Sequence, residues 1–390
     1  MIYLLLVLAA IGHVIFWAAI VNRLHGLGIE RRWIDVATIG CAVAMGALPL
    51  AIACLVWQQG VTAFISSMGL ASRTAWGYLY FCALGCILSA VHRVWIALHP
   101  ERRGALQSNH TTRVDLGHHH REQLTAPGIP RLLARIPGNQ VLDLHVHEKR
   151  LSIPRMPVGR ELRIVHITDL HMSGRVAKEY FCEMAAAVNA LEPDLIMLTG
   201  DVVEREQCMS WLPDTLGQLR ARAGVYYVLG NHDLRVDHRR LLRELDALGL
   251  IHVGGTWREA VVRDTTLVIA GNELPWFGPA PRAAGMPPRA TSGLPLRVLL
   301  AHTPDQFAWA RLHDFDLILA GHNHGGQIRL PLLGAILAPS LSGVRYASGT
   351  FQRDNTVLHV SRGTGGLTPF RWNCPPEIAL LVLGPAAIDR

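Results

Sequence analysis

Acidic residues, histidines and an asparagine recur directly after short apolar runs in the second half of the chain. An Asp-Leu-His triplet follows LRIVHIT, an aspartate follows DLIMLTG, and Asn-His-Asp follows VYYVLG. A histidine follows LRVLLA, and a His-Asn-His triplet follows DLILAG. One such place would be weak evidence, but five in succession point to one shared site. The candidate metal ligands in these places are Asp169, His171, Asp201, Asn231, His302, His322 and His324.

The types of these side chains indicate which metals they would bind. Carboxylates and imidazoles without a thiolate suit Mn²⁺, Fe or Zn²⁺ in a catalytic site better than a structural zinc. Seven ligating side chains are too many for one ion that keeps an open coordination position. Two divalent metal ions, about 3.5–4 Å apart and sharing a carboxylate, would accommodate them. Such a pair activates water and stabilises a phosphoryl group during its displacement, so the ligand set predicts phosphoester hydrolysis.

The apolar runs that precede these residues have the length and composition of buried β-strands. They are rich in Val, Ile and Leu, and each ends in a polar or glycine-containing turn. Helical patterns lie between them, at residues 176–191, 209–222 and 238–248. This alternation predicts an α/β domain. Because ligand sites in such folds gather at the carboxyl ends of strands, the candidate ligands should meet there.

Taken together, the motifs resemble the calcineurin-like metallophosphoesterase superfamily. Its signature DxH…GD…GNHD…H…GHxH is complete between residues 163 and 325. The resemblance implies a central β-sandwich flanked by helices. It also implies that the first ion is held by Asp169, His171, Asp201 and His324. Asp201 would bridge to a second ion, whose shell would be completed by Asn231, His302 and His322.

The same resemblance assigns a catalytic role to His232, which would stabilise or protonate the leaving oxygen without binding metal. Its neighbour Asp233 is the expected partner that orients the imidazole ring. The segments GHNHGGQIRLP, YASG, VSRGTGG and RWNCPPEIALL are further similar to a membrane-associated bacterial branch, the YaeI/YkuE-like phosphoesterases. The usual core of that branch reads GHTHGGQ, so Asn323 is a departure at a position that binds no metal.

The N-terminal part of the chain reads as a membrane anchor. Residues 1–21, 34–57 and 74–98 are nearly continuous apolar segments of about 20–25 residues, enough to cross a bilayer as helices. A positive mean hydropathy of +0.24 supports this interpretation. We therefore expect a three-helix transmembrane segment at 1–98, a proline-interrupted linker at 99–159 and a metallophosphoesterase domain at 160–390. Three spans are a second departure from the bacterial branch, whose members often have one anchor.

The arginines between the spans predict an orientation. Positively charged loops favour the cytoplasmic side of a membrane. The loop between the first two spans and the segment after the third are richer in arginine than the loop between the last two. This predicts a multi-pass protein of the bacterial inner membrane, with the N-terminus outside and the catalytic domain at the cytoplasmic face. The arginines concerned are Arg23, Arg31 and Arg32, then Arg73, then Arg102, Arg103 and Arg113.

The metal motifs define a reaction but not a substrate. The chain has a net charge of +7, but its sequence contains no run of five basic residues, so a nucleic-acid substrate is disfavoured. A proline-rich insertion at 272–295 with Trp276 and an apolar loop at 331–346 could admit an acyl chain, with phosphate-binding arginines nearby. These features favour a phosphate-containing, lipid-linked substrate at the membrane. The arginines are Arg282, Arg289, Arg329 and Arg345.

Two alternatives remain open at this point. A specific substrate would be UDP-2,3-diacylglucosamine, whose pyrophosphate bond is cleaved by some superfamily members during lipid A synthesis. The other alternative is a non-catalytic membrane protein that senses metals or acts as a scaffold. The complete ligand set together with His232 argues against the second alternative, because a scaffold needs no leaving-group acid.

Overall fold

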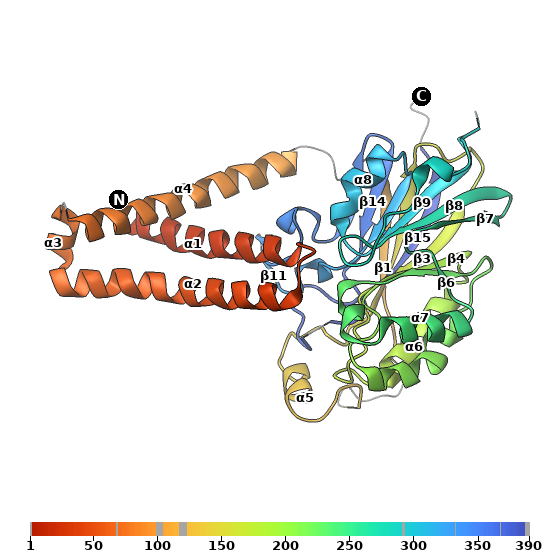
Figure 1. The fold of residues 1–390 in the computed structure, drawn as a ribbon, viewed down its shortest axis with the longest axis horizontal. Coiled ribbons are helices and arrows are strands. Elements are labelled where there is room, and N and C mark those ends of the chain that lie inside the picture. Colours follow the sequence, from red (N-terminus) through yellow and green to blue (C-terminus); the bar gives the residue numbers. More distant parts are fainter. Residues whose placement is uncertain are drawn as a thin grey trace. The chain divides into compact units, whose positions relative to one another are not determined.

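The chain forms two units, which are described separately. The computed structural model describes residues 2–67, 69–98, 104–116, 123–290, 293–331, 333–366 and 368–386. One unit comprises residues 1–100 with 339–343, and the other comprises residues 101–338 with 344–390. Figure 1 shows the long helices of the first unit and the sheets of the second.

The first unit is a bundle of long apolar helices. Its helices are α1 Ile2–His25, α2 Arg31–Gln59, the short α3 Val61–Ser66 and α4 Leu70–Leu98. Three of them are long and apolar enough to cross a membrane, over Ile2–His25, Arg32–Gln59 and Leu70–Trp95. They correspond to the three predicted spans.

Close packing and one polar cluster join these helices. A Cβ atom at Gly12 of α1 would lie 1.8 Å from the Cys82 carbonyl oxygen of α4, so glycine permits the two backbones to touch. The His13 ring bonds through Nδ1 to the Tyr78 hydroxyl at 2.6 Å and through Nε2 to the Met45 carbonyl at 2.9 Å. His13 thereby connects α1, α4 and α2.

The second unit is built on two large sheets. The first has seven strands in the order β1-β2-β15-β3-β4-β5-β6, and the second has six in the order β13-β14-β10-β9-β8-β7. The strands of the first are β1 Leu106–Arg113, β2 His145–Ile153, β15 Glu377–Pro385, β3 Leu162–Ile167, β4 Leu195–Thr199, β5 Val225–Val228 and β6 Ile251–His252. Those of the second are β13 Gly349–Arg353, β14 Thr356–Val360, β10 Leu317–Ala320, β9 Leu296–Ala301, β8 Thr265–Asn272 and β7 Trp257–Val262. A small hairpin pairs β11 Arg329–Leu330 with β12 Gly334–Ala335.

Alternating side chains of the strands produce the layers. In β3, Ile164 packs into the core between the two sheets, whereas Val165 packs on the opposite face, in the core that contains Tyr180 of α6. The helices of this unit are α5 Ile129–Ala134, α6 Lys178–Ala190, α7 His238–Ala247 and α8 Phe307–Leu312. Phe307 of α8 packs on the outer face of the second sheet. The predicted β-sandwich flanked by helices is thus confirmed.

The structure corrects the prediction of a linker at residues 99–159, because this segment contributes β1 and β2 to the seven-stranded sheet. β2 pairs with β15 in parallel and with β1 in antiparallel orientation. Its buried positions include His147 and Lys149, and Lys149 forms an ion pair with Glu377 of β15. Polar residues at inward positions remove the apolar alternation by which a strand is recognised.

The helix predicted at residues 209–222 is also corrected. The structure has 3₁₀ helices there, at Glu206–Asp214 and Leu216–Gln218. Pro213 lies inside the first of them and cannot donate a backbone hydrogen bond, which disfavours a continuous α-helix.

Candidate metal centre

The predicted ligands lie in the turns that follow five strands of both sheets. β3, β4 and β5 run parallel in one sheet, and β9 and β10 run parallel in the other, so their carboxyl ends can share one edge. Several residues in these turns have a backbone conformation in the left-handed region. Such strained conformations are common at functional sites. The φ values are 53° at Asp169, 49° at His171, 54° at Asp201, 70° at His322 and 48° at His324.

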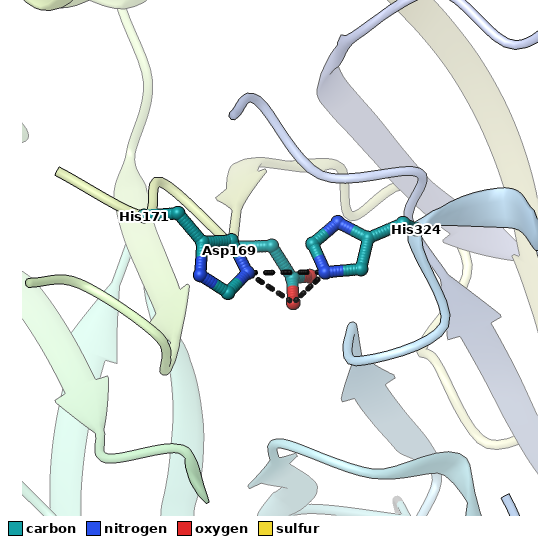
Figure 2. Close-up of side chains that lie close together, drawn as sticks. All are labelled: Asp169, His171 and His324. Carbon is teal, nitrogen blue, oxygen red and sulfur yellow. Dashed lines mark hydrogen bonds and ion pairs between the residues drawn. The ribbon is translucent and has the colours of Figure 1, made fainter. Parts of the chain in front are cut away.

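The first cluster consists of Asp169, His171 and His324. The two imidazoles face each other through their Nε2 atoms, which are 3.0 Å apart. Asp169 Oδ1 lies 3.6 Å from His324 Nε2 and 3.9 Å from His171 Nε2. Figure 2 shows the three side chains converging on one point. All three are buried, and their ligand atoms are close enough to hold one metal ion.

The second cluster consists of Asp201, His302 and His322, with Asn231 beside it. His302 Nε2 lies 3.1 Å from Asp201 Oδ2 and 3.2 Å from His322 Nδ1. The side-chain oxygen of Asn231 lies 3.1 Å from the same His302 nitrogen. His302 Nδ1 contacts the Thr199 carbonyl oxygen at 2.7 Å, which turns Nε2 toward the cluster.

Asp201 faces both clusters with one oxygen atom. Its Oδ2 lies 3.1 Å from His302 Nε2 and 3.5 Å from His171 Nε2. Among the described residues, none donates a hydrogen bond to this buried oxygen. The other oxygen, Oδ1, accepts a hydrogen bond from the His232 backbone N–H at 2.8 Å. A buried carboxylate oxygen between two groups of imidazoles fits divalent cations, because a cation would compensate its charge.

The pKa values of the buried carboxylates are strongly shifted. Burial raises the pKa of Asp169, and the nearby Asp201 raises it further. Burial alone would also raise the pKa of Asp201, but the imidazoles of His302, His232 and His171 hold it well below its usual value. The ionised form of Asp201 therefore depends on positive charge around it, which bound cations would supply.

Glu204 is a site residue that the sequence analysis did not identify. Its Oε1 atom lies 2.9 Å from His171 Nδ1 and 2.6 Å from His232 Nδ1. Burial alone would raise the pKa of this carboxyl, but the two imidazoles lower it far below its usual range. A carboxylate on Nδ1 fixes the tautomer and directs Nε2 of each ring the other way. An acidic residue three positions after Asp201 was the available signal.

The structure also corrects the predicted role of Asp233. Its carboxylate accepts backbone hydrogen bonds from Gly230, Asp201, Val202 and Val203, at 2.8 to 3.1 Å. Asp233 therefore shapes the turns that carry Asp201 and Asn231, whereas the His232 ring is oriented by Glu204. Burial raises the pKa of Asp233 to about 7, and the nearby Asp201 adds to this shift.

A glycine-containing loop, residues 360–366, packs against the turn that carries Asp169 of the first cluster. A Cβ atom at Gly363, where φ is +74°, would lie 2.7 Å from Asp169 Cβ. One at Gly365 would lie 1.8 Å from the Leu170 carbonyl oxygen. The fully buried Arg371 donates hydrogen bonds to the carbonyls of Arg362, Gly365 and Cys374, which fixes this loop. The VSRGTGG motif thus serves close backbone approach to the ligand turn.

Of the two loops predicted to border the site, the insertion at 272–295 contacts it directly. The Trp276 ring lies with its centroid 4.9 Å from that of His322 and 5.5 Å from that of His302. Arg289, predicted as a phosphate ligand, is instead held by Asp314 and Asp316, each at 2.9 Å. Arg329 donates to the Gly325 carbonyl and to the Ser348 hydroxyl.

Known proteins share this domain. Residues 162–326 match the family described as calcineurin-like phosphoesterase. The chain is 31% identical to phosphodiesterase YaeI of Escherichia coli, over 57% of this chain and 82% of that protein. It is 30% identical to an uncharacterised metallophosphoesterase, YkuE of Bacillus subtilis, over 57% of this chain and 78% of that protein. It is 25% identical to UDP-2,3-diacylglucosamine pyrophosphatase LpxG of Chlamydia muridarum, over 56% and 83%.

Proposed function

Because the chain belongs to the calcineurin-like phosphoesterase family, whose members are metal-dependent phosphoester hydrolases, we propose that it binds two divalent cations and hydrolyses a lipid-linked phosphate compound at a membrane surface. The observation that carries the two-ion proposal is the position of Asp201 Oδ2, 3.1 Å from His302 Nε2 and 3.5 Å from His171 Nε2. One cation belongs with the first cluster and the other with the second.

The protein residues divide the work of this reaction. When bound, the two ions activate a water molecule and neutralise charge on the phosphoryl group. Asp169, His171 and His324 would hold one ion, His302, His322 and Asn231 would hold the other, and Asp201 would contribute to both. His232, oriented through Nδ1 by Glu204, donates a hydrogen bond or a proton to the leaving oxygen. Trp276 covers the second cluster and limits the access of water.

Three observations support a lipid-linked substrate. Within the part of the chain that the structure describes, three helices are long and apolar enough to cross a membrane. The loop at 331–346 exposes Leu333 and Leu337, a few residues after His324. A relative acts on UDP-2,3-diacylglucosamine, according to its name, and we take this pyrophosphate as the specific candidate substrate. The bond cleaved would then be a phosphoanhydride.

The proposed location is the bacterial inner membrane, with all three helices crossing it and the catalytic domain in the cytoplasm. The arginine distribution between the helices supports this orientation. A reporter fused after Arg390 that is active only in the periplasm would contradict it.

Hydrolysis by the detergent-purified chain with added Mn²⁺ tests the substrate. Bis(p-nitrophenyl) phosphate, p-nitrophenyl phosphate and UDP-2,3-diacylglucosamine are compared, with His232→Ala as the control for contaminating activity. Preferred turnover of the diacylated compound supports the proposal. Turnover of the small esters alone would contradict the lipid-linked substrate while leaving the phosphoesterase chemistry intact.

A further inference from the structure

The segment around α5 exposes an apolar face that the proposed reaction does not use. α5 and its flanks have the sequence GIPRLLARIPG, and no residue of the helix is buried. Ile129 is 72% exposed and Leu132 is 61% exposed, and Ile136 is exposed as well. Ile129 and Leu132 are three positions apart in the helix and share one face, and Ile136 follows two residues after the helix ends.

This face continues onto a second exposed apolar group in the same unit. The Asn139 side chain donates to the carbonyls of Leu133 and Pro369, at 2.8 and 2.9 Å, which ties the α5 segment to the chain before Trp372. A Cβ atom at Gly138 would lie 3.7 Å from the Trp372 ring. Trp372 and Ile328 are exposed and form a backbone bridge.

The hairpin β11–β12 extends the group further. It begins one residue after Ile328, and it carries the exposed Leu333 at its tip and Leu337 just beyond. We call the combined set the apolar surface; it consists of Ile129, Leu132, Ile136, Ile328, Leu333, Leu337 and Trp372.

The two sequence stretches that supply most of the apolar surface carry charges of one sign. Residues 124–142 and 317–353, which supply all of it except Trp372, contain no aspartate or glutamate. The first of these stretches carries Arg131 and Arg135 within and beside α5, and the second carries Arg329. Exposed apolar side chains interleaved with arginines are complementary to a bilayer that contains anionic lipids.

We infer that the apolar surface docks onto the anionic headgroup region of the bilayer in which the chain's own helices are anchored. Only residues 99–105 separate α4 from β1, a length of at most about 29 Å when fully extended, so the domain stays within reach of that bilayer. Ile328 lies four residues after the ligand His324, so docking brings this edge of the metal centre to the lipid. The inference rests on the proposed membrane location but not on the proposed substrate.

Hydrogen exchange on the whole chain, with its apolar helices, tests this docking. The chain is reconstituted in nanodiscs of phosphatidylcholine alone and in nanodiscs that also contain phosphatidylglycerol. We expect residues 129–136 and 333–337 to exchange more slowly when the anionic lipid is present, while β7 is unchanged. The variant Arg131→Gln/Arg135→Gln should weaken docking about 30-fold, because each arginine contributes about 1 kcal/mol near an anionic surface.

Apolar variants and a matched control complete the experiment. Ile129→Ser/Leu132→Ser should abolish the protection, whereas Val261→Ser on β7, at a position 69% exposed, should retain it. All variants should hydrolyse bis(p-nitrophenyl) phosphate at the wild-type rate, which shows that they are folded. Equal exchange in both kinds of nanodisc would overturn the inference. Protection that rises with protein concentration would also overturn it, because a second copy would then be the occupant.

Discussion

Replacing Glu204 by glutamine tests how the site orients its imidazoles. The carboxylate accepts a hydrogen bond from His171 Nδ1 at 2.9 Å and lies in an ion-pair contact 2.6 Å from His232 Nδ1, whereas a glutamine side chain would offer its oxygen without a negative charge. Hydrogen bonds to charged groups contribute about 1.5–3 kcal/mol and neutral ones about 0.5–1.5 kcal/mol. Loss of the negative charge therefore costs about 1–1.5 kcal/mol for each of the two imidazole contacts and about 2–3 kcal/mol in all.

At 1.36 kcal/mol per factor of ten, this loss lowers kcat/KM by about 30- to 150-fold at limiting metal. The part of the loss that acts through His171 is a weaker affinity for metal, so saturating Mn²⁺ should restore this part of the activity. The part that acts through His232 is a loss in the reaction itself, and about a 5- to 15-fold deficit should remain.

The assay measures kcat/KM for bis(p-nitrophenyl) phosphate across a Mn²⁺ titration, with bound metal determined by mass spectrometry. Glu206→Gln is the matched control, since Glu206 lies in the same segment but is exposed, and its carboxylate contacts the Asp237 backbone N–H and Arg240 rather than an imidazole. A wild-type Mn²⁺ dependence and rate for Glu204→Gln would refute the assignment of Glu204 as the residue that orients both rings.

Further predictions concern the bridge, the metal requirement and the buried histidine of β2. Asp201→Ala should lose metal as well as activity, and a variant that keeps both ions would contradict its bridging role. A chelator should abolish turnover and Mn²⁺ should restore it, so activity that survives metal removal would argue against metal-dependent hydrolysis. Burial lowers the pKa of His147 from 6.5 to about 4, so protonation favours the unfolded state. Its contribution to stability is complete above pH 6.5 and is lost as the pH falls toward 4, by about 3 kcal/mol in total. His147→Gln should therefore lose less thermal stability than the wild type between pH 7 and pH 5, and equal losses would refute this account.

The sandwich and the ligand turns could be predicted because their strands are buried on both faces. Such strands are continuous apolar runs in the sequence, and polar residues such as Asp169, Asp201 and His302 mark where they end. The structure brings all seven candidate ligands to one edge, as expected from parallel strands. Their assignment to two particular ions remains a prediction.

The parts that escaped prediction depend on contacts between residues distant in sequence. β2 carries Lys149 at a buried position, and its partner Glu377 lies 228 residues further along the chain. Glu204 lies in a loop without periodicity, and only the fold brings its carboxylate to His232. Asp233 is adjacent to His232 in sequence, yet the turn directs its oxygens to backbone amides instead. Adjacency along the chain was therefore a poor guide to side-chain pairing.

The most direct test of the account is metal stoichiometry and phosphodiester turnover measured on the same preparation, for wild type and His232→Ala. We predict two Mn²⁺ ions per chain in both proteins, with hydrolysis of bis(p-nitrophenyl) phosphate lowered roughly 10²–10⁴-fold in the variant. Two bound ions without turnover in the wild type, or equal turnover in both proteins, would contradict a dinuclear phosphoesterase in which His232 assists the leaving group.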